Sequence, residues 1–480
     1  MAVWTSSRRR HGVKPDIGAA GRAGRASQVG GLAVRAGVAA ALNRSQRVFA
    51  SAERKEHLDG ELELKTAEQV AEVLGGMKGV LMKLGQLASF VDDGMPEPVR
   101  AALSQLQADA PPMAPELAAG VVEDELGARP EVAFAEWDPI PIAAASIGQV
   151  HRAMTHDGRA VAVKVQYPGV DKAIAADLDN MDLAGVLAPL LFKGLDVAAV
   201  ASELRTRLTE ELDYRLEATR QQRFADWYRG HPYIHVPDVL PAVSSRRVLT
   251  SELADGARFS EMESWDQAEK DLAAETIYRF VFGSLYRIFA FNGDPHPGNY
   301  LFRGGGRVTF LDFGLVKEFA ADEIGQILRV IDGCVLNRHP GSARQACEEV
   351  GFIVPGAQVS DEAVDEFMSL FFDAVESHGV TTVTPEWASE VTRRILSGRA
   401  AHAEVVKWSN LPPPFVILQR INIGLLAILG RMSATGNFRA IAEEMWPLTL
   451  GPPSTAMGEK EAGWLKKAHP NVPLSLGGRA

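Results

Sequence analysis

The sequence predicts an α+β protein in which a small antiparallel sheet lies between two helical regions. Apolar residues recur at three- and four-residue steps from about residue 52 to 107 and over most of the chain after Gly256, as in amphipathic helices. Between these regions, alternating segments at residues 151–154 and 159–165 flank a Gly-containing turn, as in a β-hairpin. At 480 residues the chain exceeds the size at which one core usually stops growing, so we expect two lobes and an extension.

The first 51 residues differ in composition from the rest. Arginines and lysines face a single acid, Asp16, amid Gly, Ala and Ser. Such a basic segment is typical of an organelle transit peptide or a membrane-surface segment, and a disordered leader is the alternative. We therefore expect residues 1–51 to be a flexible leader, and organelle targeting stays open. No apolar signal-peptide core precedes a cleavage site, so secretion is not expected.

Two regions follow the leader. Residues 52–138 are expected to form a helical extension, because the apolar residues from 70 to 87 make one helical stripe and prolines then separate shorter helices. Lys83 lies on this stripe, where burying its charge without an acidic partner would be costly. Residues 139–253 combine the hairpin with a helical stretch and later strand-like pieces. We expect this region to form a small lobe with inserted helices.

Residues 254–450 are expected to form a larger helical lobe. Its main exception is a hairpin, residues 300–302 and 308–311, around three consecutive glycines. The longest apolar run, residues 415–429, contains polar residues and is shorter than the ~20 residues that span a bilayer, so it indicates a buried helix. Residues 451–480 have low apolar content and are expected to be a loose tail.

Charge and cysteine content exclude several kinds of protein. The formal net charge of −11 argues against a protein whose main role is binding a polyanion, so a nucleic-acid partner is not expected. Cys334 and Cys347 have neither a metal-ligand nor a redox spacing, which fits a reducing compartment. We therefore expect a cytoplasmic protein, with peripheral membrane contact left open.

The strongest chemical signal lies in the larger lobe. Asp294 and Asn299 are five residues apart on one loop, and Asp312 follows the next hairpin within Leu-Asp-Phe-Gly. Because Mg²⁺ prefers carboxylate and amide oxygens, Asn299 and Asp312 are candidate metal ligands, and Asp294 is a candidate base that orients a hydroxyl or water. His296, between two prolines, is expected to stabilise the loop rather than bind zinc. This order of residues is the active-site plan of the protein-kinase-like fold.

Segments nearer the N-terminus fit the same plan. Lys164 ends an alternating strand, where its ammonium can reach nucleotide phosphates if a carboxylate holds it. The candidate carboxylates lie on a later helix: Glu210, Glu211, Asp213 and Glu217. Backbone groups near Glu252 can meet an adenine edge. A segment before the hairpin has the spacing of the phosphate-covering loop G-x-G-x-x-G-x-V with alanine at the first two glycines, and its candidate contacts are Ala143, Ala144, Ala145, Ser146, Gly148 and Val150. An Ala-rich structural turn and a solvated acidic face are the alternatives.

These motifs resemble those of the AarF/UbiB/ADCK family of atypical kinase-like proteins over roughly residues 68–440. Lys83-Leu-Gly-Gln86 is similar to the family's K-x-G-Q signature, and the alanine-rich loop is similar to its replacement of the glycine loop. Glu211-Leu-Asp213 is similar to its E-x-D element. The resemblance implies a bilobal protein-kinase-like fold with the N-terminal helical extension packed over the active site.

The resemblance also implies particular contacts and shows few departures. Lys83 and Gln86 would form a plug against the acids of the E-x-D element. Lys164 would pair with Glu217. Arg220 stands where the family often has Asn, which would alter a metal contact near the nucleotide. A counterpart of the paired C-terminal transmembrane helices of the quinone-biosynthesis branch is not expected, so membrane contact would be peripheral.

The resulting hypothesis is a Mg²⁺-dependent atypical kinase or ATPase that binds ATP or ADP. It would act in support of isoprenoid lipid or quinone metabolism rather than on protein substrates, with a lipid or small-molecule substrate as its partner. One alternative is a small-molecule phosphotransferase of the aminoglycoside or choline kinase type, which the alanine loop and the K-x-G-Q signature disfavour. Another is a low-turnover nucleotide-binding switch or lipid-handling scaffold, which the retained Asp294 and Asp312 disfavour and which the alanine loop and the blocking helix favour.

Overall fold

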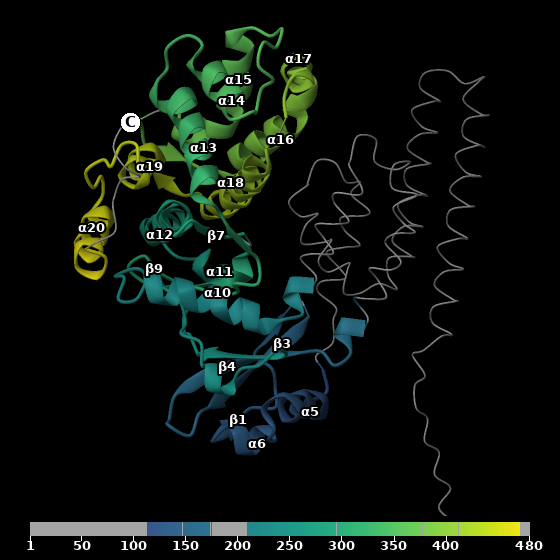
Figure 1. Cartoon of the computed structure of the whole chain (residues 1–480). Helices are drawn as coiled ribbons and strands as arrows, with labels where there is room; N and C mark the ends of the chain where they lie inside the picture. The colour runs from purple at the N-terminus through teal and green to yellow at the C-terminus, as the bar shows by residue number, and fades with distance from the viewer. Residues whose placement is uncertain are drawn as a thin grey trace, which may run out of the picture. The chain divides into compact units, whose positions relative to one another are not determined.

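The computed structural model describes residues 113–145, 147–172, 174, 209–293, 295–376, 378–410 and 412–470 (Figure 1). The chain divides into two compact units, and the second comprises residues 90–93, 112–168 and 209–480. Almost all described residues belong to this second unit, and the fold reported below is its fold. The basic leader, the K-x-G-Q helix, Ser146 and Asp294 lie outside the described residues.

A small antiparallel sheet forms the first part of this unit. Its strands run in the order β1-β3-β4-β6, and β2 pairs with β3. The strands are β1 (Glu136–Trp137), β2 (Ala143–Ala145), β3 (Gly148–Met154), β4 (Ala160–Gln166) and β6 (Val248–Glu252). In the predicted hairpin, His151 faces Val163, and Gly158 adopts a positive φ of 83° in the turn. The sequence prediction of this hairpin is confirmed.

Two helices cover one face of the sheet. Helix α5 (Pro115–Leu126) ends at Gly127, which has the left-handed conformation that favours glycine, and α6 (Pro130–Ala133) follows. Ala118, Val121 and Val122 of α5 share one buried cluster with alternate valines of β4, because a helix stripe and one strand face are complementary apolar surfaces. The expected division at residue 138, between the helical extension and the small lobe, therefore runs through one packed core, because α5 and β4 belong to the same cluster.

Helix α10 (Tyr214–Trp227) joins the sheet to the helical part that follows (Figure 1). The side chain of Asp213 caps its N-terminus by accepting a hydrogen bond from the backbone N–H of Arg215. Glu217, Gln221 and Phe224 recur at helical spacing on its buried face. The ring of Phe224 packs 5.7 Å from that of Phe280, so α10 is part of the larger core.

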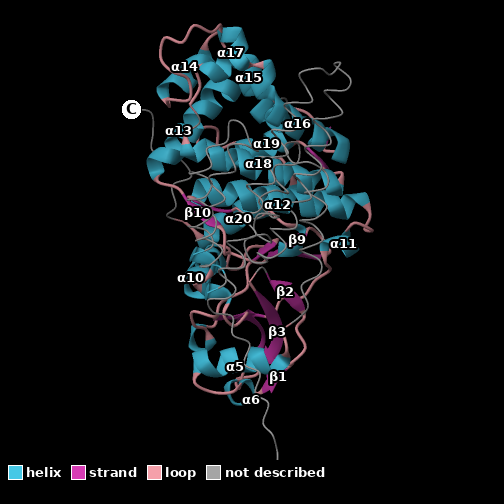
Figure 2. Ribbon diagram, turned by 90° about the vertical axis from the view of Figure 1, so that its right-hand side faces the viewer, coloured by secondary structure: helices cyan, strands magenta, loops and turns pink. Residues whose placement is uncertain are grey.

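Helix α12 (Gln267–Arg287) runs through the centre of the larger core and contacts α18 and α19 (Figure 2). Asp266 caps it, and nearly every residue after Leu272 is buried. Small strands gather beside it. The hairpin of β8 (Tyr300–Arg303) and β9 (Arg307–Phe310) was predicted and is confirmed, and β9 pairs in parallel with β5 (Ile234–His235). Strand β7 (Ala290–Asn292) pairs with β10 (Val316–Glu318).

The remaining elements complete a helical lobe. Short pieces are η1 (Pro241–Val243), α11 (Phe259–Met262), η2 (Pro297–Asn299), η4 (Asp373–Val375), β11 (Thr381–Thr382) and β12 (Thr435–Gly436). The helices are α13 (Ala321–Ile331), the π-helix η3 (Asp332–Leu336), α14 (Ser342–Glu349), α15 (Asp361–Phe372), α16 (Pro385–Ala401), α17 (Ala403–Lys407), α18 (Pro413–Met432) and α19 (Phe438–Met445). The apolar run forms α18, as predicted. None of the described helices is long and apolar enough to cross a bilayer.

The C-terminal segment contradicts the prediction of a loose tail. Residues Ala456–Ala468 form helix α20, capped by Thr455, and Trp464 is buried against the ring of His231 at 4.5 Å. Glu461 is fully buried and accepts hydrogen bonds from Arg279, at 2.8 Å, and from Arg287. This segment of low apolar content is helical because a few large or charged side chains pack against the lobe. The average composition of the segment does not show such single contacts.

Candidate active site

A buried ion pair joins the sheet to helix α10. Lys164 extends from β4, and its Nζ lies 2.8 Å from Oε1 and 3.0 Å from Oε2 of Glu217 on α10. The same Nζ lies 3.5 Å from Oδ2 of Asp312, in the loop after β9. The side chains of Lys164 and Glu217 are only 14% and 7% exposed. The structure therefore contains the pair that the resemblance implied and adds Asp312 to it.

The electrostatics of these three groups keep a positive charge fixed in place. Burial disfavours the ammonium of Lys164, but the carboxylates of Asp312 and Glu217 outweigh it, and the pKa of Lys164 lies above its ordinary value. Burial raises the pKa of Glu217, against the attraction of Lys164. With both acids ionised, Lys164, Glu217 and Asp312 together carry one net negative charge.

Asp312 occupies a strained turn that sets the direction of its carboxylate. Its φ of 60° lies in the left-handed region, which costs a non-glycine residue ~1–3 kcal/mol and persists only where surrounding contacts enforce it. Oδ1 accepts a hydrogen bond of 3.0 Å from the backbone N–H of Gly314, and the Asp312 carbonyl accepts one of 2.9 Å from Nδ2 of Asn292. Oδ2 is left on the side of Lys164.

The β8–β9 hairpin brings Asn299 next to the Asp312 turn. Its carbonyl accepts a hydrogen bond of 2.8 Å from the N–H of Leu311, so residues 299 and 312 occupy neighbouring ends of the two strands. Nδ1 of His296 accepts a hydrogen bond of 3.1 Å from Gly298 N–H, which is the loop-stabilising arrangement expected for this histidine. Within the described ranges, no group of three or more His, Cys, Asp or Glu residues could hold a metal ion. The carboxylate of Asp312 and the side-chain amide of Asn299 carry hard oxygens of the kind that Mg²⁺ prefers.

The alanine-rich segment forms one strand of a narrow hairpin over this side of the sheet. Ala143 faces Val150 and Ala145 faces Gly148 across β2 and β3. A Cβ at residue 148 would lie 2.2 Å from the carbonyl oxygen of Val165, so only glycine lets β4 pass this close. This packing explains Gly148 without reference to a ligand. The contacts proposed for the other loop residues stay predictions.

Two groups that were predicted to make functional contacts already have partners within the described residues. The backbone N–H of Glu252 donates to the carbonyl of Asp238 at 2.9 Å, and that of Leu253 donates to Ala160 at 3.0 Å, so neither N–H is available to an adenine edge. Asp213 is paired with Arg215 at 2.6 Å, which holds the pKa of this carboxyl below its usual range. The carbonyl of Glu211 accepts a weak hydrogen bond of 3.4 Å from Gln166. The expected partners of this element, Lys83 and Gln86, lie outside the described residues.

Sequence reasoning missed Tyr214 at this site and did not foresee the contact that Arg220 makes. The ring of Tyr214 lies 5.1 Å from Nζ of Lys164, and its buried hydroxyl has no hydrogen-bond partner among the described residues. Arg220 donates to the carbonyl of Gly314 at 3.0 Å, in the turn that holds Asp312. Both residues stand three positions from Glu217 on α10, and this spacing was the available signal, because such residues share a helix face.

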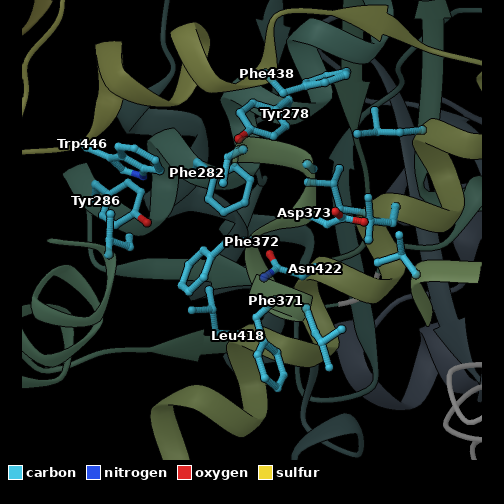
Figure 3. Close-up of a pocket in the computed structure, with 18 residues that line it drawn as sticks. Tyr278, Phe282, Tyr286, Phe371, Phe372, Asp373, Leu418, Asn422, Phe438 and Trp446 are labelled. Carbon is cyan, nitrogen blue, oxygen red and sulfur yellow. The ribbon is translucent and has the colours of Figure 1, made fainter. Parts of the chain in front are cut away.

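A cavity of about 70 Å³ lies in the helical lobe, apart from this site (Figure 3). Its wall is mostly aromatic and aliphatic, with Tyr278, Phe282 and Tyr286 of α12 on one side. Asn422 of α18 and Asp373 place polar groups in the same wall. None of the candidate site residues lines this cavity, so it belongs to the core of the lobe and not to the Lys164 site.

Comparison with known proteins shows which family and relatives the chain resembles. The model of the ABC1 atypical kinase-like domain matches residues 105–343. The chain is 31% identical over 307 residues to atypical kinase COQ8, mitochondrial, of Saccharomyces cerevisiae, covering 63% of this chain and 61% of that protein. It is 33% identical over 287 residues to Protein ACTIVITY OF BC1 COMPLEX KINASE 8, chloroplastic, of Arabidopsis thaliana, covering 57% of this chain and 37% of that protein. The chain thus spans less than two thirds of the length of these relatives.

A solved structure extends the likeness over most of the chain. The structure is that of Rv3197 in complex with erythromycin from Mycobacterium tuberculosis, with 32% sequence identity and a TM-score of 0.58. The match covers 81% of this chain and 98% of that one. The α+β architecture described above is therefore kinase-like, and the chain belongs to the AarF/UbiB/ADCK family of ABC1 atypical kinase-like proteins.

Proposed function

We propose that this protein binds a Mg²⁺–ATP complex and transfers or hydrolyses the terminal phosphoryl group. The observation that supports this proposal most is the convergence of Lys164, Glu217 and Asp312 from three separate elements. Proteins with this kinase-like plan generally use ATP and Mg²⁺. A cation fixed by one carboxylate, with a second carboxylate within 3.5 Å, is the arrangement needed to hold phosphate oxygens on one side and a metal on the other.

Each residue has a proposed part in that chemistry. Lys164 binds the α- and β-phosphates, and Glu217 keeps its ammonium directed at them. Asp312 and Asn299 would hold Mg²⁺, which neutralises charge on the phosphates when it is bound. Asp294 would orient the attacking hydroxyl or water. The hairpin of Ala143–Ala145 would cover the phosphates with its backbone, while Lys83 and Gln86 would close the site as a plug.

We propose that the acceptor is a small or lipid-like molecule of isoprenoid lipid or quinone metabolism rather than a protein. The resemblance of the motifs to those of the AarF/UbiB/ADCK family supports this choice, as does the K-x-G-Q signature, which in that family fills the place of a protein substrate. Peripheral contact with a membrane fits such an acceptor. A nucleotide-binding switch with little turnover is the competing function, and turnover measurements separate the two.

Replacing Asp312 by Asn is expected to lower Mg²⁺-dependent ATP turnover by at least ~10²-fold, because the carboxylate that would hold the metal becomes a neutral amide. Turnover of the purified full chain is measured with and without liposomes. Asp322→Asn, an exposed acid at the start of α13, is the matched control and should turn over ATP as the unmodified chain does. ATP binding without turnover in the unmodified chain would favour the switch.

A further inference from the structure

Helix α10 contacts the Asp312 turn with two side chains that lie one helical turn apart. Burial raises the pKa of the Glu217 carboxylate, while the backbone of Phe313 faces this group and favours its ionised form, which lowers the pKa. Nη1 of Arg220 donates to the carbonyl of Gly314 at 3.0 Å. Residues i and i+3 lie on the same face of a helix, so α10 holds the turn at two successive residues.

Arg220 is well placed to hold this position rigidly. Its side chain is only 12% exposed, and Nη2 makes a second contact of 3.2 Å with Oε2 of Glu210. The guanidinium is planar and presents its donors in a fixed fork, so two simultaneous contacts restrict both its position and its orientation. Hydrogen bonds from an ionised donor are also stronger than neutral ones. One side chain therefore links the segment before α10 to the loop after β9.

The conformation of the turn depends on Gly314, because the carboxylate of Asp312 is hydrogen-bonded to the backbone of that residue. Asp312 has a positive φ, and its Oδ1 depends on the N–H of Gly314. Gly314 has no side chain of its own, and glycine backbone rotates more freely than that of any other residue. The contact from Arg220 to the Gly314 carbonyl removes that freedom. Arg220 is therefore connected to the carboxylate of Asp312 by two hydrogen bonds, both made by the backbone of Gly314.

We propose that Arg220 is a positioning residue for Asp312, which fixes the carboxylate in the orientation required for binding the divalent cation. This inference rests on the proposed function and adds to it a residue whose hydrogen bonds go to Gly314 and Glu210. Loss of Arg220 should weaken metal binding more than it weakens nucleotide contacts made through Lys164.

The test compares Arg220→Met with Arg223→Met, each in the full chain. Arg223 stands one turn further along α10 and joins it to Glu318 at 2.8 Å and to the Ile288 carbonyl, without contacting the turn. The half-saturating Mn²⁺ concentration for nucleotide binding is followed by the paramagnetic resonance of Mn²⁺. We expect it to rise at least 10-fold in Arg220→Met and less than 2-fold in Arg223→Met. We also expect added guanidinium ion, below denaturing concentrations, to restore part of the loss.

Hydrogen exchange provides a readout that does not depend on nucleotide binding. The amides of residues 312–316 should exchange faster in Arg220→Met than in Arg223→Met. Equal Mn²⁺ requirements in the two variants, with equal exchange, would overturn the positioning role while leaving the proposed function intact. Absence of Mn²⁺–nucleotide binding in the unmodified chain would instead overturn the proposed function, and with it the metal-directed part of this inference.

Discussion

Replacement of Lys164 by Met is expected to lower kcat/KM for Mg²⁺–ATP by at least ~10²-fold and to leave the chain folded. Removing one preorganised donor to a developing charge typically costs ~10²–10³-fold in rate. Nζ of Lys164 lies 2.8 Å from Glu217 and 3.5 Å from Asp312, where we propose that it contacts the phosphates. Methionine has a similar length and no charge, so it removes the phosphate contact with little change in packing.

The fold should tolerate this change because Glu217 can take up a proton. Burial already raises its pKa, and a neutral carboxylic acid is far less costly to bury than an unpaired carboxylate. The melting temperature is therefore measured beside kcat/KM. Arg152→Met, which removes an exposed cation from the neighbouring strand β3, is the control and should leave kcat/KM unchanged. A Lys164→Met variant with unchanged kcat/KM would remove Lys164 from the proposed phosphate contact.

Replacement of Glu461 by Ala is expected to lower the free energy of unfolding by ~3–5 kcal/mol, because breaking a buried ion pair leaves an uncompensated charge. Glu461 receives hydrogen bonds from Arg279 and Arg287 and lies 3.8 Å from Nε2 of His231. Arg279 keeps Glu275 and Glu444 as partners. Arg287 loses the carboxylate that it contacts. Typical domains are stable by only ~5–15 kcal/mol, so the loss is large.

Denaturant unfolding at several pH values tests this prediction. Burial opposes ionisation of Glu461, but Arg287, His231 and Arg279 outweigh it and hold its pKa well below the usual range. A lowered pKa in the folded state contributes stability above the unfolded pKa, about 4.3, that is lost as the pH falls towards the folded value. The difference between the unmodified chain and Glu461→Ala should therefore be full at pH 7 and shrink below about pH 4. Glu459→Ala, exposed on the same helix, should show no difference at either pH.

Local patterns predicted the parts of the fold that depend on near neighbours. The β3–β4 and β8–β9 hairpins each have alternating residues around a glycine turn, and both form at the expected places. The apolar run forms α18, and most of the residues from Ile421 to Gly430 are buried, as expected for a helix that is apolar on nearly all sides. The pairing of Lys164 with Glu217 spans 53 residues. The order of motifs left four carboxylates open as partners, and only the family resemblance implied Glu217.

The parts that were not predicted depend on single long-range contacts. Arg220 reaches Gly314 across 94 residues, and Arg279 reaches Glu461 across 182. Neither contact leaves a periodic signal in the sequence. Helix α20 was expected to be loose for this reason, since its order comes from Glu461 and Trp464 and not from overall apolar content. Backbone groups near Glu252 were expected to meet an adenine edge. The N–H of Glu252 donates instead to the carbonyl of Asp238, a contact between distant segments that β-strand patterns do not predict.

The central claim is that Asp312 and Asn299 hold a divalent ion beside phosphates bound by Lys164. The most direct measurement is a crystal structure of the full chain with Mn²⁺ and a non-hydrolysable ATP analogue, using the anomalous signal of manganese. We predict a manganese peak within ~2.0–2.3 Å of a carboxylate oxygen of Asp312 and of the Asn299 carboxamide oxygen, with a phosphate oxygen hydrogen-bonded to Nζ of Lys164. Nucleotide bound without contact to Lys164, or manganese away from Asp312, would contradict the account.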